Sequence, residues 1–339
     1  MSVMKAIVLG IVQGLTEFLP VSSSGHLRIV PALLKWDDPG APFTAVIQLG
    51  TMAAVLLYFR KDLWRIAVAW TRSLRDRSLR HDLDARMGWY LIIATIPIAV
   101  LGFVFKDQIK SGARDLRLIA ATLIVFGLVL AIADRVGKQR KAIDQIDPRE
   151  GVTIGLAQSM ALVPGVSRSG ATISAGLFLG YTREDAARFS FLLSIPAVVL
   201  SGLFELKDVG SGKGVPGVGV TVLATVVAFV VGYASIAWLL RYLVHHTVTV
   251  FVMYRVVLGL LLVVLLATNA IDARSKENTA APHRTRATVS VARATAAARS
   301  VASASGTRTV ADVRPARTTS ARTATRLVAA APRGTRDGS

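Results

Sequence analysis

Long apolar runs constrain the fold of this 339-residue chain more than any other feature of its sequence. A helix needs about 20 mostly apolar residues to cross the roughly 30 Å hydrocarbon core of a bilayer. Hydrophobic residues make up 53% of the chain, which is too many for a soluble domain of this length, so we predict an all-α polytopic membrane protein. The predicted spans are residues 42–59, 87–105, 116–136, 186–206, 215–240 and 248–268.

Two further apolar segments, residues 3–34 and 151–179, are each interrupted near the middle by a polar Ser/Gly cluster. A helix, a turn and a second helix fit each segment, and neither helix is long enough to span. Irregular backbone at membrane depth is tolerated where protein or a water-filled cavity surrounds it. We therefore predict that each segment forms a re-entrant helical hairpin.

The two interrupted segments match each other when the sequence is shifted by 145 residues. Because the matches cluster around the polar motifs, they predict an internal repeat. Each half then holds one hairpin and three spans, and this odd number of crossings gives two inverted-topology repeats, residues 1–140 and 148–270. The matched pairs are Gly10 and Gly155, Gln13 and Gln158, Val21 and Val166, Ser22 and Ser167, Ser24 and Ser169, and Gly25 and Gly170.

The charged residues lie between the apolar runs or in residues 272–339, a segment rich in Ala, Thr, Ser and Arg that we predict to be a disordered basic tail. The net charge of +19 therefore predicts contact with membrane lipids and no nucleic-acid partner. Loops on one side of the predicted topology carry fourteen Lys and Arg, against five on the other, which places the first set in the cytoplasm. We expect truncation after Asp272 to leave catalysis largely intact.

The first hairpin carries Gln13 and Glu17, which lie four residues apart and therefore on one helix face. An ionisable residue inside a membrane segment is a functional candidate, although Glu17 could instead lie at a membrane edge in contact with water. With no Cys in the chain, chemistry must depend on such residues or on a hard metal ion. Carboxylate and amide oxygens suit Mg²⁺ or Ca²⁺, so Glu17, with Gln13 beside it, predicts a divalent cation site.

The residues after Glu17 favour anion binding. Pro20 ends the first helix, and the run Ser22, Ser23 and Ser24 can cap a second one, so that N–H groups and hydroxyls point into the break. A phosphate suits a helix N-terminus, where unsatisfied donors meet the positive end of the dipole. His26, in the first turn of the second helix, could be a general acid, a base, a nucleophile or a structural residue.

The second hairpin again has a break followed by a capped helix, with Ser167, Ser169 and Thr172 around Arg168. A guanidinium inside an apolar segment needs an anionic partner, and its planar fork matches phosphate oxygens. The alternative partner is Glu17, in a structural ion pair between the two hairpins. Arg255 could supply a second cation for phosphate or could reach the headgroups from its helix end. Together these groups predict phosphoryl transfer.

Residues 13–26, QGLTEFLPVSSSGH, and 164–172, PGVSRSGAT, resemble the two signature motifs of the bacterial undecaprenyl-diphosphate phosphatase family, also called bacitracin-resistance proteins. Residues 46–50 and 254–255 resemble further family segments, so the likeness covers roughly residues 1–269. It implies hydrolysis of a polyprenyl diphosphate lipid, undecaprenyl diphosphate, to undecaprenyl phosphate and inorganic phosphate on the outer face of the cytoplasmic membrane. This reaction recycles the lipid carrier for cell-wall synthesis and confers bacitracin resistance. The resemblance also implies inverted repeats with re-entrant helices and dependence on Mg²⁺ or Ca²⁺.

The motif positions also imply roles for individual residues. The family motif begins with Glu or Gln, so Gln13 is an accepted form that leaves Glu17 as the metal-binding carboxylate. Whether Ser23, His26 or water is the nucleophile stays open, as does homodimer formation. The expected catalytic residues are Glu17, Ser23, His26 and Arg168, and the expected substrate-binding residues are Gln13, Ser22, Ser24, Ser167, Ser169, Thr172 and Arg255.

Two other classes of membrane protein share parts of this pattern. Secondary transporters and flippases also combine inverted repeats with broken helices that meet at the midplane. Lipid phosphatases related to phosphatidic-acid phosphatases have Ser-Gly-His and Ser-Arg motifs, but theirs needs a His six residues after the Arg. In this chain that position is Ser174, so the nucleophilic His of the second class is missing here.

Overall fold

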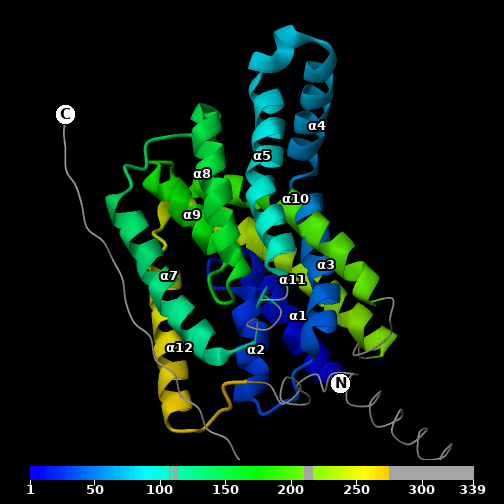
Figure 1. Cartoon of the computed structure of the whole chain (residues 1–339), viewed down its shortest axis with the longest axis vertical. Coiled ribbons are helices and arrows are strands. Elements are labelled where there is room, and N and C mark those ends of the chain that lie inside the picture. The colour runs from blue at the N-terminus through cyan, green and yellow to red at the C-terminus, as the bar shows by residue number, and fades with distance from the viewer. Residues whose placement is uncertain (107, 110–113, 210–216, 275–339) are drawn as a thin grey trace, which may run out of the picture. The chain divides into compact units, whose positions relative to one another are not determined.

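The computed structural model describes residues 1–106, 108–109, 114–209 and 217–274, which lie within one compact unit, Met1–Ala280. Residues 275–339, most of the predicted tail, lie outside the described part. The described residues are helical, and the one β-bridge found among them joins Lys141 to Tyr181. The helices in chain order (Figure 1) are α1 (Val3–Phe18), α2 (Ser23–Leu33), α3 (Gly40–Tyr58), α4 (Arg60–Arg75), η1 (Arg77–His81), α5 (Leu83–Val104), α7 (Leu116–Val136), η2 (Ile143–Gln145), α8 (Pro148–Ser159), η3 (Met160–Leu162), α9 (Arg168–Phe178), α10 (Arg183–Val209), α11 (Val218–His245) and α12 (Thr249–Ala267).

The prediction of an all-α polytopic membrane protein is confirmed. In the described part of the chain, α5, α7, α11 and α12 are each long and apolar enough to cross a membrane. Helices α3 and α4 supply a fifth such element if they are counted as one span bent by 72°. The segment predicted at residues 186–206 forms most of α10, which is not among these elements.

Helix α4 corrects the expectation that residues 60–86 form a loop. Leu63, Ile66 and Trp70 recur at helical spacing and give α4 an apolar side that packs on α5, while its Arg and Lys residues lie elsewhere on the helix. Gly88 on α5 makes room for this contact, because a Cβ there would lie 2.9 Å from that of Trp70. Figure 1 shows α4 and α5 side by side, joined at the top of the view. The many charges of the segment hid this helix in the sequence.

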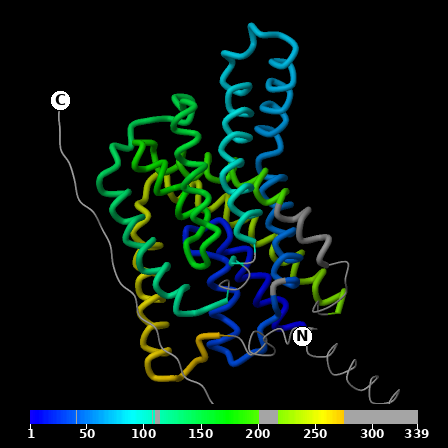
Figure 2. The backbone as a smooth tube through the Cα atoms, viewed as in Figure 1, coloured from blue at the N-terminus to red at the C-terminus, as the bar shows by residue number. Residues whose placement is uncertain are grey.

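Both interrupted segments consist of a helix, a short turn and a second helix. Ser22 is the N-cap of α2 and Ser167 is the N-cap of α9, and each side-chain oxygen accepts a hydrogen bond from the backbone N–H three residues later. Their φ angles are 78° and 73°, in a region that costs a non-glycine residue about 1–3 kcal/mol. Figure 2 shows the two turns, blue and green, close to each other. The two segments therefore share an unusual local geometry as well as a motif.

The first helix of each segment packs against a helix from the other half of the chain. Helix α1 contacts α11, and α8 contacts α5. A Cβ at Gly10 would lie 2.6 Å from the backbone oxygen of Ala224, and one at Gly155 would lie 2.4 Å from that of Ala94. Since Gly10 and Gly155 are a matched pair, the same glycine position allows close backbone contact in both halves.

Candidate functional site

The carboxylate of Glu17, at the end of α1, is the centre of a polar cluster beside the first break. Its Oε2 atom accepts a hydrogen bond of 2.6 Å from the Ser23 hydroxyl and one of 3.1 Å from Nε2 of Gln13. Gln13 is buried and also donates to the hydroxyl of Thr51 on α3, at 3.3 Å. Glu17 and Gln13 share one helix face as predicted, and they meet the first residue of α2 across the break.

Arg168, the first residue of α9, extends this cluster to the second break. Its guanidinium forms an ion pair with Oε1 of Glu17, and both side chains are largely buried. A second link between the breaks is the bond of 3.0 Å from the Ser169 hydroxyl to the backbone oxygen of Leu19. The two predicted hairpins therefore meet directly, and Arg168 takes the partner that the sequence offered as the alternative to phosphate.

Four of the other predicted hydroxyl residues are serines that form two close pairs, and the fifth is Thr172. Ser22 and Ser24 have their oxygens 3.3 Å apart, and Ser167 and Ser169 have theirs 3.1 Å apart, so the same pair of hydroxyls faces each capped helix end. Thr172 is buried and bonds to the hydroxyl of Ser190 on α10, at 2.6 Å. This hydrogen bond joins α9 to α10. Contact of Thr172 with a substrate stays a prediction.

His26 does not bond to the Glu17 cluster. Its Nδ1 lies 2.7 Å from the backbone oxygen of Ser22, and its Nε2 lies 2.7 Å from the hydroxyl of Tyr254 on α12. The two rings are stacked, with centroids 5.5 Å apart. Nothing in the spacing of residues 26 and 254 predicts this contact, so Tyr254 is not among the predicted site residues. The available signal was the position of Tyr254 beside Arg255, in a segment that resembles one of the undecaprenyl-diphosphate phosphatase family.

Arg255 is fully buried, and its guanidinium joins the backbone of both breaks. It donates to the carbonyl oxygen of Pro20 at 3.0 Å, of Gly165 at 3.1 Å and of Val166 at 3.0 Å, and more weakly to two carbonyls of α7. A break in a helix leaves carbonyl groups without their N–H partners, which is costly in an apolar surrounding. Arg255 supplies those partners. The predicted contact with substrate would require these bonds to be exchanged.

Oxygen atoms near Glu17 fit a divalent cation. Among the described residues, no group of three or more His, Asp or Glu side chains is placed to hold a metal ion by itself. However, Oε1 of Gln13 is buried and has no hydrogen-bond partner in the described part of the chain, and it belongs to the side chain that bonds to Glu17. Mg²⁺ is often held by one or two carboxylates together with substrate phosphates. Gln13 faces Glu17 with Nε2, so Oε1 would join the carboxylate as a ligand once the amide turns over.

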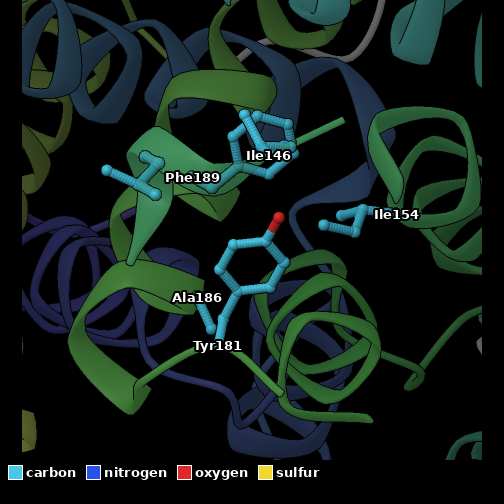
Figure 3. A pocket seen from close by; sticks show the side chains of 6 residues that line it. Ile146, Ile154, Tyr181, Ala186 and Phe189 are labelled. Atoms are coloured by element: carbon cyan, nitrogen blue, oxygen red, sulfur yellow. The ribbon is translucent and has the colours of Figure 1, made fainter. Parts of the chain in front are cut away.

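A small apolar pocket lies away from the breaks. It is too narrow to hold a water molecule and is lined by Ile143, Ile146, Ile154, Tyr181, Ala186 and Phe189. Figure 3 shows these side chains around the ring of Tyr181. The Tyr181 hydroxyl donates to buried Glu150, at 2.6 Å, so the polar group at this pocket is already satisfied. None of the predicted site residues lines it.

Comparisons with known proteins agree on one family. The family model described as bacitracin resistance protein BacA matches residues 6–261. The chain is 57% identical to an undecaprenyl-diphosphatase of Nocardioides sp., over 80% of this chain and 98% of that protein. It is 53% identical to undecaprenyl-diphosphatase 2 of Streptomyces avermitilis, over 82% and 99%. It is 54% identical to an undecaprenyl-diphosphatase of Thermobifida fusca, over 79% and 91%.

Proposed function

The chain belongs to the family of the bacitracin resistance protein BacA, and we propose that it hydrolyses undecaprenyl diphosphate to undecaprenyl phosphate and inorganic phosphate. The reaction returns the lipid carrier to cell-wall synthesis and confers resistance to bacitracin. One observation carries the assignment of the site: the ion pair between Glu17 and Arg168 joins two capped helix ends, with Ser23 bonded to the same carboxylate. A guanidinium, a carboxylate and two helix N-termini are the groups that binding and cleavage of a diphosphate require.

Arg168 and the two capped helix ends bind the diphosphate. The guanidinium of Arg168 leaves Glu17 and pairs with phosphate oxygens, because a dianionic phosphate outweighs a single carboxylate. Preorganised donors aimed at developing charge cost no reorganisation during the reaction. The paired hydroxyls of Ser22 with Ser24, and of Ser167 with Ser169, supply further donors. Ser23 and His26 are the candidate nucleophile and proton-transfer groups.

Glu17 and Gln13 would hold the divalent cation, Mg²⁺ or Ca²⁺. A bound cation neutralises charge on the phosphate that is cleaved. Glu17 supplies the carboxylate, and the unpartnered Oε1 of Gln13 supplies a second oxygen. With a cation bound there, Glu17 would no longer need Arg168 as its counter-charge, and the guanidinium of Arg168 would bind substrate phosphate.

The protein has two inverted-topology repeats, residues 1–140 and 148–270, each with a re-entrant hairpin. The matched positive φ angles of Ser22 and Ser167 support this arrangement, as does the packing of α1 and α8 on helices of the opposite half. Residues 60–86 and 135–149 carry the basic residues of the cytoplasmic side. The active site opens to the outer side of the cytoplasmic membrane.

Release of inorganic phosphate from undecaprenyl diphosphate by the purified full-length protein in detergent tests this function. We expect Glu17→Gln and Arg168→Gln to lower turnover at least about a hundredfold, the usual cost of removing one charge-stabilising group. Glu184→Gln on α10 and Arg241→Gln on α11 are matched controls that should retain turnover. Phosphate release by both site variants at the wild-type rate would contradict the proposed site. Transport of the lipid without phosphate release would instead favour a flippase.

A further inference from the structure

Tyr254 lies on α12 between the membrane-facing surface and a buried imidazole. Its side chain is 47% exposed, and its neighbours on the same helix face, Val250, Met253 and Val257, are more exposed still. His26, which stacks against its ring, is only 4% exposed. The ring of Tyr254 therefore covers one face of His26 and separates it from the apolar surface along which a polyprenyl chain would lie.

The two partners of His26 define its hydrogen-bonding state. The backbone oxygen of Ser22 can only accept, so Nδ1 of His26 carries a hydrogen and donates it at 2.7 Å. In the neutral imidazole Nε2 is then an acceptor, and the hydroxyl of Tyr254 donates to it at 2.7 Å. When Nε2 gains a proton, the same hydroxyl oxygen can accept, because a phenol both donates and accepts. The pair therefore tolerates both protonation states of His26 without rearrangement.

We propose that Tyr254 carries the proton between His26 and the reacting group, so that His26 is a base and not the nucleophile. This inference rests on the proposed phosphatase function and extends it to a residue outside the predicted site. Nε2 is the one ring nitrogen of His26 that can gain a proton, and the hydroxyl of Tyr254 occupies it. A direct attack by Nε2 on phosphorus would require Tyr254 to leave first.

The transfer balances with two protons in motion. The hydroxyl of Tyr254 gives its proton to Nε2, and its oxygen takes one from the attacking water or serine hydroxyl. The nucleophile loses one proton, His26 gains one and Tyr254 is unchanged. The oxygen of the nucleophile forms a bond to the terminal phosphorus, and the bond from that phosphorus to the bridging oxygen breaks. The reverse proton path then protonates the bridging oxygen of the leaving lipid phosphate. If serine is the nucleophile, water attacks the phosphoserine by the same path and releases inorganic phosphate. The lipid phosphate never needs to enter the buried space around the imidazole.

Single-turnover phosphate release by the full-length protein tests the relay. Tyr254→Phe keeps the stacked ring and removes the hydroxyl, and we expect the rate constant of cleavage to fall about tenfold to a hundredfold, with KM little changed. Tyr233→Phe on α11, whose ring makes an edge contact with Tyr58, is the matched control and should retain the wild-type rate. The double variant His26→Gln, Tyr254→Phe should have nearly the same rate constant of cleavage as either single variant, since both changes remove the same proton pathway.

Solvent deuterium isotope effects provide a readout that a merely structural role would not change. The wild-type rate plotted against deuterium fraction should be curved, because two protons move together, and the plot for Tyr254→Phe should be linear. A wild-type rate in Tyr254→Phe, a linear plot for the wild type, or a phosphoryl group trapped on His26 would each overturn the relay.

The ¹⁵N resonance of Nε2 separates this inference from the function. It should shift in Tyr254→Phe whether or not the substrate is hydrolysed, with His26→Gln used to assign it. Absence of phosphate release in the wild type would remove the proposed function. If Glu17→Gln lost phosphate release while Tyr254→Phe released phosphate at the wild-type rate, the relay would be refuted and the proposed function would stand.

Discussion

The carboxylate of Glu17 pairs with the guanidinium of Arg168 across 151 positions of the sequence, and both side chains are largely buried. Removing one partner of a buried ion pair leaves the other charge uncompensated and destabilises a protein by about 3–5 kcal/mol. We therefore expect Glu17→Ala and Arg168→Ala each to lower the free energy of unfolding by about 3 kcal/mol, and the double variant to lose less than the sum. Denaturant titration in detergent measures these values. Fully additive losses would show that the two charges do not interact in solution.

A carboxylate at position 13 should strengthen the binding of a divalent cation. Oε1 of Gln13 has no partner in the described part of the chain, and Gln13→Glu would place a charged oxygen beside Glu17. We expect the Mg²⁺ concentration that gives half-maximal phosphate release to fall about tenfold, because a hard cation prefers a charged oxygen ligand. Titration of metal into chelator-treated protein measures it. Activity of chelator-treated wild-type protein would contradict the need for a cation.

The buried guanidinium of Arg255 should be essential for folding. Arg255→Met keeps much of the side-chain volume but leaves the carbonyl groups of Pro20, Gly165 and Val166 without donors. Each unsatisfied buried group costs about 1–3 kcal/mol, so we expect low yield or a strongly lowered melting temperature. Arg241→Met, at an exposed position of α11, should fold like the wild type. If Arg255→Met had the same melting temperature as the control, these bonds would not stabilise the backbone at the two breaks.

Alanine at either matched glycine should loosen the packing between the halves. Gly10→Ala and Gly155→Ala would each place a Cβ under 3.0 Å from a backbone oxygen of the facing helix. We expect each to lower the free energy of unfolding by about 1–3 kcal/mol, as overpacking does. Gly102→Ala on α5 is the control, because its Cβ would lie an ordinary 3.5 Å from the nearest side chain. Thermal unfolding distinguishes them, and equal stability of all three variants would contradict the close approach.

The start of the basic tail should matter for stability and not for catalysis. The N–H of Leu116 donates to the carbonyl of Ala273 at 2.9 Å, and Arg274 lies 3.4 Å from Asp115. A chain that ends at Arg274 should match the full-length protein in phosphate release and melting temperature. A chain that ends at Asp272 should keep its turnover but melt at a lower temperature, because it loses the Ala273 bond. A well-folded chain ending at Arg274 without turnover would refute this division.

Local features of the sequence predicted much of this structure. Apolar runs identified α5, α7, α11 and α12, because the length and hydropathy of a spanning helix are set within the segment itself. Pro20 and the following serines identified the first break and its cap for the same reason. The end of α3 was also predicted, but the charged residues after it concealed the amphipathic helix α4.

Contacts between distant segments were harder to predict. The sequence suggested that Glu17 and Arg168 could pair, because each needs an opposite charge inside an apolar segment. It gave no means of pairing His26 with Tyr254, since an imidazole and a phenol find many partners. The same limit applies to Arg255, whose partners are backbone carbonyls that carry no sequence signal. The roles of these side chains depend on helix packing, which the spacing of residues does not encode.

The packing of α1 on α11 bears on how the chain is made. Gly10 leaves the ribosome early, whereas the backbone of Ala224 that it contacts is synthesised only after most of the chain has entered the membrane. Helix α1 is therefore in contact with lipids or other segments until α11 has been synthesised. The first half cannot reach its final packing before then. The contact of α1 with the second half is therefore made late, and a chain that ends before α11 lacks the surface on which its first helix packs.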